Sequence, residues 1–252
     1  MQKKDLHIHT AFSDGSNTPE ECVIAAIEKG LQTVGISDHS YIDDTTYEPY
    51  WLKKDAEQDY KRTVTALKEK YKDKIEVLLG IEQDYYSFAP ASGYDYIIGS
   101  VHFLRTDDGF FAIDENLEDM RSHIEFFDND IYNFVDLYYG TVADVVNKTN
   151  CDIIGHFDLI TKFNGENLLF DEKNERYIAA YKKAANALIE TGKPFEINTS
   201  ALYRGLKKEP YPSYAVIDYL KSLGAKFILS SDAHKKENIA RSFEINDLKK
   251  YL

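Results

Sequence analysis

The stretch Asp5-Leu6-His7-Ile8-His9-Thr10, with Ser13-Asp14-Gly15 shortly after it, decides how the rest of the chain is interpreted. Polar and apolar residues alternate from residue 5 to residue 9, a pattern that favours a β-strand. Because successive strand side chains point to opposite faces, His7 and His9 share one face. With the Asp14 carboxylate close behind, the pair indicates one part of a metal site, although a His-x-His pair alone fits simple packing equally well.

The composition is that of a globular protein, with 252 residues of which 43% are hydrophobic and 29% charged. This length is typical of an α/β barrel, so we expect residues 1–252 to form a single domain. The formal net charge of −13 argues against nucleic acid as the main partner, because a phosphate backbone would be repelled.

The positions of the cysteines and the lengths of the apolar runs further limit the class of protein. Cys22 and Cys151 lie far apart in the sequence, which provides neither a disulfide framework nor a thiolate metal cluster. The chain opens with no apolar leader segment, and no run approaches the roughly 18 apolar residues of a membrane span. We therefore expect a cytoplasmic protein with no membrane partner.

Seven short apolar, β-branched runs alternate with helical patterns along the whole chain. The predicted strands are 5–9, 32–37, 75–82, 95–101, 151–155, 194–199 and 225–231, and the main predicted helices are 19–29, 53–72, 130–148, 173–191 and 213–223. This alternation implies a mainly parallel sheet with right-handed crossovers. Seven strands without a tandem repeat predict an α/β barrel with seven staves.

The stretch 103–130 stands apart because it is acidic, aromatic and without a clear period. Long segments that follow barrel strands build the mouth of the active site, so this stretch fits a lid. A solvated surface loop fits its composition equally well.

Residues able to bind metal lie at or just beyond the carboxyl ends of six of the seven predicted strands. The nine candidate ligands are His7, His9, Asp14, His39, Glu82, His102, His156, Asp232 and His234. The carboxyl ends of the strands are the face on which barrel enzymes build their active sites. Only His123 lies elsewhere among the histidines, and we assign it no role. The remaining strand ends in Glu196-Ile197-Asn198, which is less typical of a ligand.

Nine ligands at one end of a barrel are enough for two or three divalent ions, since a single ion takes only about four or five. Imidazoles mixed with carboxylates fit Zn, Mn or Fe better than Ca or Mg, which prefer oxygen ligands. Such a cluster performs hydrolysis by acidifying water and neutralising charge on the attacked group. A small-molecule phosphate ester is the natural substrate, because its transition state carries negative charge on several oxygens.

A phosphate substrate also needs cations at the mouth of the site. Arg204 lies just beyond the sixth predicted strand, and its planar guanidinium matches phosphate geometry. Arg241, Lys235 and Arg105 also follow strand ends and are weaker candidates for phosphate contact.

The ordered set of motifs resembles a known family. These motifs are Asp-Leu-His-Ile-His-Thr with Ser13-Asp14-Gly15, Ser37-Asp38-His39, Gly80-Ile81-Glu82, Gly-Ser-Val-His-Phe at 99–103, Ile-Gly-His at 154–156 and Ser-Asp-Ala-His at 231–234. Together they resemble the PHP (polymerase and histidinol phosphatase) superfamily over nearly the whole chain. The single-domain length, the segment from residue 99 with its long following loop, and the segment 196–200 leading to Arg204 are most similar to the monofunctional bacterial histidinol-phosphate phosphatases.

The resemblance implies a distorted (β/α)7 barrel with three divalent metal ions. Carried over position by position, one ion is held by His7, His9, Glu82 and Asp232, a second by Glu82, His102 and His156, and a third by Asp14, His39 and His234. Many members have histidine where this chain has Asp14, a difference that bears on metal preference.

The implied reaction converts histidinol phosphate and water into histidinol and phosphate, a step of histidine biosynthesis. Water activated by the ions attacks phosphorus, and Asp232, His234 and Arg204 are the expected catalytic residues. Asp38, Ser100 and Asn198 are candidates for orienting the ligands.

Three other interpretations remain. The first is a different PHP-type phosphoesterase that acts on nucleotides, sugar phosphates or DNA 3′ ends. The second is a metal-dependent amidohydrolase on a related barrel, which lacks the Ser-Asp-Ala-His pattern found at 231–234. The third is a non-catalytic metal-binding module, which the complete ligand set disfavours.

Overall fold

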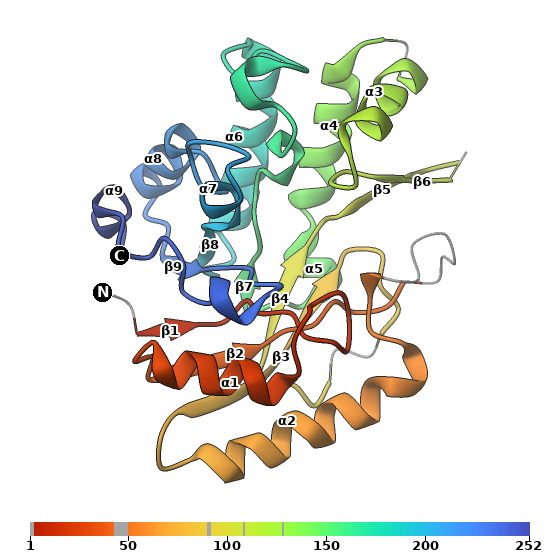
Figure 1. Cartoon of the computed structure of the whole chain (residues 1–252). Helices are drawn as coiled ribbons and strands as arrows, with labels where there is room; N and C mark the ends of the chain where they lie inside the picture. The colour runs from red at the N-terminus through yellow and green to blue at the C-terminus, as the bar shows by residue number, and fades with distance from the viewer. Residues whose placement is uncertain (1–2, 43–49, 90–91, 108, 128) are drawn as a thin grey trace.

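A seven-stranded parallel sheet forms the centre of the computed structural model, which describes residues 3–42, 50–89, 92–107, 109–127 and 129–252 (Figure 1). In sheet order the strands are β1 (Lys4–Asp5), β2 (Thr33–Ile36), β3 (Glu76–Asp84), β4 (Tyr96–Ser100), β7 (Ile153–Ile154), β8 (Phe195–Asn198) and β9 (Phe227–Ser230). Each strand overlaps a predicted strand, but β1 shares only Asp5 with the predicted strand 5–9, within which Ile8 forms an isolated bridge, and β3 runs two residues further than expected. The predicted barrel with seven staves is confirmed.

The two edges of the sheet meet just beyond the ends of β1 and β9. Ile8 and Ala233 form a parallel bridge there. The amide of His9 donates to the carbonyl of Ala233 at 3.0 Å, and the amide of Ala233 donates to the carbonyl of His7 at 3.1 Å. This closure brings the first and last predicted ligand segments side by side at the carboxyl end of the barrel.

The interior of the barrel near the strand amino ends is filled by the ring of Tyr96, whose hydroxyl donates to the carbonyl of Leu6 at 2.6 Å. A Cβ atom at Gly35 would lie 2.1 Å from the Tyr96 hydroxyl, and one at Gly80 would lie 2.2 Å from its ring. Only glycine leaves room for this ring at both positions. Around it lie the buried side chains of Leu6, Ile98, Ile153 and Ile228.

Helices cover the outside of the barrel, where their apolar faces pack on the strands. They are α1 (Pro19–Glu28), α2 (Glu57–Tyr71), α4 (Ile131–Val142), α5 (Val145–Thr149), α6 (Glu175–Ile189), α7 (Ser200–Arg204), α8 (Tyr214–Ser222) and α9 (Asn246–Lys249), with short 3-10 turns at Lys54–Ala56, Leu159–Thr161, Gly165–Asn167 and Lys236–Asn238. The long helical pattern predicted over 130–148 is divided between α4 and α5. Within the described ranges, no helix is both long and apolar enough to cross a membrane.

The acidic and aromatic stretch 103–130 is more regular than its sequence suggested. It forms an antiparallel hairpin of β5 (Phe103–Thr106) and β6 (Gly109–Ala112), followed by α3 (Leu117–Phe126); residues 108 and 128 lie outside the described residues. The hairpin projects from the barrel beside α3 and α4 (Figure 1). His123 lies on α3, where its Nε2 atom is 3.0 Å from the carbonyl oxygen of Ala112. Hairpin and helix are therefore joined to each other.

Candidate metal centre

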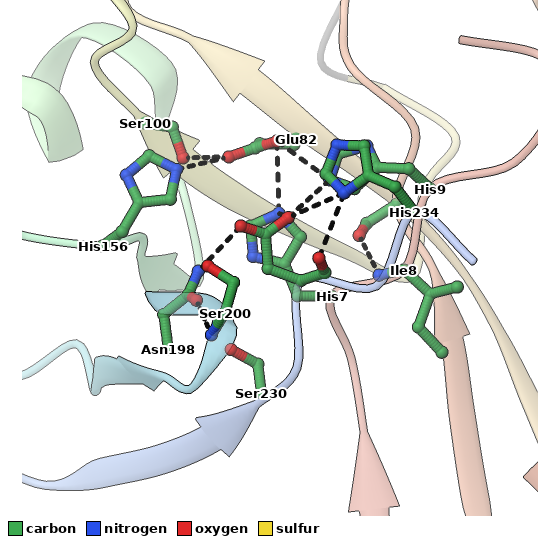
Figure 2. Close-up of polar contacts among 12 residues, drawn as sticks. His7, Ile8, His9, Glu82, Ser100, His156, Asn198, Ser200, Ser230 and His234 are labelled. Atoms are coloured by element: carbon green, nitrogen blue, oxygen red, sulfur yellow. Dashed lines mark hydrogen bonds and ion pairs between the residues drawn. The ribbon is translucent and has the colours of Figure 1, made fainter. Parts of the chain in front are cut away.

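Glu82, at the carboxyl end of β3, is the centre of the site. Figure 2 shows its carboxylate between His156 on one side and His9 on the other, with His7 below it. Its Oε2 atom lies 3.2 Å from His7 Nε2, 3.4 Å from His9 Nε2 and 2.9 Å from His39 Nδ1, and its Oε1 atom lies 2.9 Å from His156 Nε2 and 3.4 Å from His102 Nε2. Five histidines from four other strand ends therefore converge on one buried carboxylate.

A second part of the site is organised around Asp14, in the loop that follows β1. Its Oδ2 atom lies 3.0 Å from His234 Nε2, and its Oδ1 atom lies 3.8 Å from both His39 Nε2 and His9 Nδ1. Asp14 and His234 are partly exposed, whereas His9 is fully buried. This group therefore forms the more accessible side of the site.

Asp232 links the two parts and is held in an unusual conformation. Its φ angle of 51° is in the left-handed region, which is strained for a residue other than glycine. The Tyr203 hydroxyl donates to the backbone carbonyl of Asp232 at 3.0 Å, and the side-chain amide of Asn198 donates to the Asp232 Oδ2 atom at 3.2 Å. Its Oδ1 atom lies 3.2 Å from His9 Nε2. The strained backbone therefore aims this carboxylate at the histidines.

The residues fit divalent metal ions, as their unsatisfied atoms show. Among the described residues, His7 Nε2, both ring nitrogens of His9, and Glu82 Oε2 are buried and have no hydrogen-bond partner. Buried polar atoms normally have a partner, and an ion would supply one here. Three groups have ligand atoms within 4.8 Å of one another: His9, Asp14, His39 and His234; His7, His9 and Glu82; and His39, Glu82 and His102.

Glu82 and His9 are already in the protonation states that metal binding requires. Burial alone would raise the pKa of Glu82, yet His7 and His102 beside it hold that pKa well below the usual range. Burial, together with His39 and His234, lowers the pKa of His9 to about 3. An ionised carboxylate and a neutral imidazole are the forms that ligate metal. For His7, His39 and His102, burial opposes but neighbouring carboxylates raise the pKa, so these histidines release a proton when they ligate metal.

A buried carboxylate that the sequence interpretation passed over, Glu196 on β8, supports these ligands. Its Oε1 atom lies 2.5 Å from His7 Nδ1 and accepts a hydrogen bond from the Ser230 hydroxyl. Its Oε2 atom accepts a hydrogen bond from the His156 amide at 2.7 Å. In the sequence, Glu196 was marked only by its position near the end of a predicted strand, two residues before Asn198. Glu196 therefore orients ligands from two other strands.

Asp84 and Ser100 also orient ligands. The Oδ2 atom of Asp84 accepts a hydrogen bond from the His102 amide at 3.0 Å and lies 3.3 Å from His102 Nδ1. The Ser100 hydroxyl donates to Glu82 Oε1 at 2.6 Å, as Figure 2 shows. Such contacts fix ligand orientation and tautomer.

Asp38 does not contact the imidazole of His39 beside it in sequence. Instead, its carboxylate accepts hydrogen bonds from the amide and the hydroxyl of Thr10, both at 2.7 Å, and from the hydroxyl of Ser13 at 2.5 Å. Its contribution is to fix the loop that carries Asp14.

A cavity of about 260 Å³ opens over the candidate metal ligands. Its lining includes His102, His156, Arg204, Trp51, Lys162 and Tyr211. The Nη2 atom of Arg204 donates to His234 Nδ1 at 3.0 Å, so the guanidinium lies directly beside a candidate ligand. Lys162, a cation that the sequence interpretation missed, donates to Asp114 Oδ2 at 3.1 Å.

The other three predicted phosphate contacts do not line this cavity. Arg241 donates to Asn238 Oδ1 at 3.1 Å, and Arg105 lies over the ring of Phe110 in the hairpin. Lys235 precedes a 3-10 turn. Of the four predicted cations, the structure therefore brings only Arg204 to the cavity.

Comparison with known proteins adds to this geometry. The PHP domain family matches residues 5–200. The histidinol-phosphatase of Bacillus subtilis is 26% identical over 267 residues, which cover 97% of this chain and 98% of that protein.

Solved structures share the fold. One from Listeria monocytogenes has a TM-score of 0.83 at 21% identity and covers 97% of this chain and 100% of its own. The histidinol phosphate phosphatase of Lactococcus lactis, in complex with zinc, L-histidinol and phosphate, has a TM-score of 0.65 at 22% identity. The match covers 93% of this chain and 87% of that one. Because the family match spans most of the residues and includes seven of the nine candidate ligands, the chain belongs to the PHP domain family.

Proposed function

We propose that this chain hydrolyses histidinol phosphate to histidinol and phosphate, with divalent metal ions held by the nine converging ligands. The observation that carries the proposal is the set of buried, unsatisfied ligand atoms at His7, His9 and Glu82, which lies below a cavity that also contains Arg204. The names of the Bacillus subtilis and Lactococcus lactis relatives support histidinol phosphate as the substrate.

The proposed ligand sets are those that the resemblance to the PHP family implies, and the three groups in the structure support them by sharing most of their residues. His7, His9, Glu82 and Asp232 hold one ion, Glu82, His102 and His156 a second, and Asp14, His39 and His234 a third. Zinc is present in the Lactococcus lactis relative, and Mn or Fe suits the same mixture of imidazoles and carboxylates. When bound, such ions supply an ionised water at neutral pH and neutralise charge on the phosphate.

The chain's own residues position the ester. Arg204 donates hydrogen bonds to phosphoryl oxygens, for which its planar fork is suited. Its contact with His234 places the guanidinium beside the accessible ligand group. Asp232 and His234 hold that side of the site in place, since the Asp232 carbonyl oxygen also lies 3.1 Å from His234 Nδ1.

A panel of phosphate esters tests the proposal. The metal-loaded protein is assayed for phosphate release from histidinol phosphate, a nucleotide, a sugar phosphate and a short oligonucleotide. We expect the highest kcat/KM for histidinol phosphate, and growth of a histidine-requiring strain that lacks its own histidinol phosphatase. A higher kcat/KM for nucleotides or sugar phosphates, or no growth with well-expressed protein, would contradict it.

A further inference from the structure

Tyr211 is a rigidly held residue at the wall of the cavity. Its backbone forms an antiparallel bridge with Asn198, the last residue of β8. The Asn198 amide donates to the Tyr211 carbonyl at 2.7 Å, and the Tyr211 amide donates to the Asn198 carbonyl at 2.9 Å. Asn198 in turn contacts Asp232 through its side chain. Tyr211 is thus fixed relative to the metal-binding residues.

The hydroxyl of Tyr211 is buried and unsatisfied. The residue is only 2% exposed, and its hydroxyl has no hydrogen-bond partner in the part of the chain that the structure describes. Buried tyrosine hydroxyls usually find a partner, because leaving one unpaired is costly. Phenylalanine would fill the same space without this cost, so the hydroxyl points to a partner outside the chain.

Tyr211 is itself one of the residues that line the cavity. Burial raises the pKa of Tyr211 well above its usual value, the carboxylates of Asp158, Asp114 and Asp232 raise it further, and Arg204 opposes them. Asp114, Asp232 and Arg204 all line the cavity. The hydroxyl therefore stays protonated and is able to donate a hydrogen bond at the cavity wall.

We propose that Tyr211 donates a hydrogen bond from its hydroxyl to a phosphoryl oxygen of the bound ester, beside the Arg204 guanidinium. This assignment rests on the proposed function in requiring a phosphate ligand, but it does not depend on which alcohol the phosphate is attached to. Tyr211 is then a residue that binds the group shared by substrate and product.

An internal partner is the competing explanation. Asp158 Oδ1 is also buried without a hydrogen-bond partner among the described residues. After burial, the charge of Asp158 contributes most to raising the pKa of Tyr211. If Tyr211 were satisfied by Asp158 through an internal water, its hydroxyl would stabilise the free protein and would not bind phosphate. The two explanations predict opposite effects on stability.

The experiment compares Tyr211→Phe with Tyr138→Phe in the metal-loaded protein. Tyr138 is a matched control, since it is 1% exposed and its hydroxyl donates to the Phe157 carbonyl at 3.2 Å. For each variant we measure metal content, the Tm with and without inorganic phosphate, the inhibition constant of inorganic phosphate, and kcat/KM for histidinol phosphate and p-nitrophenyl phosphate.

For Tyr211→Phe we expect unchanged metal content and a phosphate-free Tm equal to or above that of the unmodified protein. The inhibition constant of phosphate should rise about 10- to 100-fold, as expected when a hydrogen bond to a charged group is lost. The kcat/KM should fall by a similar factor for both esters. Tyr138→Phe should lower the Tm and leave phosphate inhibition unchanged.

An unchanged inhibition constant of phosphate in Tyr211→Phe overturns the assignment. So does a fall in the phosphate-free Tm as large as that of Tyr138→Phe, because it would show that the hydroxyl already has an internal partner. The proposed function fails separately, if the unmodified protein does not hydrolyse histidinol phosphate. Phosphate inhibition can be measured with any ester that the protein turns over.

Discussion

The Oε1 atom of Glu196 lies 2.5 Å from the Nδ1 atom of His7, and both side chains are fully buried. In this contact the protonated Nδ1 atom of His7 donates a hydrogen bond to the Glu196 carboxylate. The Nε2 atom, on the other side of the ring, faces Glu82 and Asp232. A carboxylate behind a histidine fixes the ring and raises its basicity, which strengthens its binding to metal. Glu196 therefore decides which nitrogen of His7 is available to the proposed ion.

Glu196→Gln tests this relationship. The variant keeps the shape of the side chain but removes its charge, so we expect metal affinity to fall about 10- to 100-fold. Metal content after dialysis against a graded series of chelator concentrations provides the measurement. Glu69→Gln, at an exposed position on α2, is the control and should retain metal like the unmodified protein. Equal retention by both variants would contradict a role for Glu196 in the site.

Asp38→Asn should loosen the loop that carries Asp14. The buried carboxylate of Asp38 accepts hydrogen bonds from Thr10 and Ser13, and an amide cannot accept all of them. We expect the free energy of unfolding in urea to fall by about 1–3 kcal/mol. We also expect a selective loss of the ion assigned to Asp14, His39 and His234. A variant that keeps the full metal content would show that Asp38 does not position Asp14.

Arg204→Ala should lower kcat/KM for phosphate esters about 100-fold, because a donor aimed at the reacting phosphate is lost. Metal content should stay unchanged, which separates phosphate contact from a structural effect on His234. Arg204→Lys should recover little of the loss, since an ammonium cannot reproduce the planar fork. Arg241→Ala is the control, because Arg241 does not line the cavity. If Arg204→Ala and Arg241→Ala behaved alike, the role of Arg204 would be wrong.

His123 should make the unmodified protein less stable in acid. Burial lowers the pKa of His123, although the Ala112 carbonyl and Asp119 oppose the shift. The unfolded chain therefore binds a proton more readily, so the stability that neutral His123 contributes is present above its unfolded pKa of about 6.5 and is lost as the pH falls below it.

His123→Gln removes this titration and keeps a donor for Ala112. The free energy of unfolding of the variant minus that of the unmodified protein is compared at pH 8 and pH 5.5. Contributions from the metal ligands are common to both proteins and cancel in the difference. We expect this difference in the free energy of unfolding to be larger at pH 5.5 than at pH 8, because only the unmodified protein loses stability through His123. A difference that is the same at both pH values would contradict the assignment.

The barrel and the ligand positions could be predicted because each depends on a local pattern. Short β-branched runs between amphipathic helices define the strands, and parallel strands place their carboxyl ends together. Residues such as His39, His102 and His156 directly follow those runs, so their convergence follows from the topology alone. The bridge between Ile8 and Ala233 then completes the arrangement.

Other features depend on contacts that no local pattern encodes. Glu196 and Asp84 are strand residues whose partners come from distant segments, and a strand-end carboxylate looks the same in sequence whether it binds metal or a ligand's imidazole. Lys162 and Tyr211 lie in irregular segments that only the tertiary fold brings to the cavity. The hairpin of β5 and β6 had a signal in the aromatic and apolar pairs Phe103-Leu104 and Phe110-Phe111, which the acidic composition of 103–130 obscured.

Metal reconstitution tests the central claim most directly. The protein is stripped with chelator, divalent metal is added back stepwise, and phosphate release from histidinol phosphate is measured against the metal bound per chain. We expect no release from the stripped protein and full activity when all three proposed ligand sets are filled. Phosphate release that persists in fully stripped protein, or no release from fully loaded protein, would contradict the account.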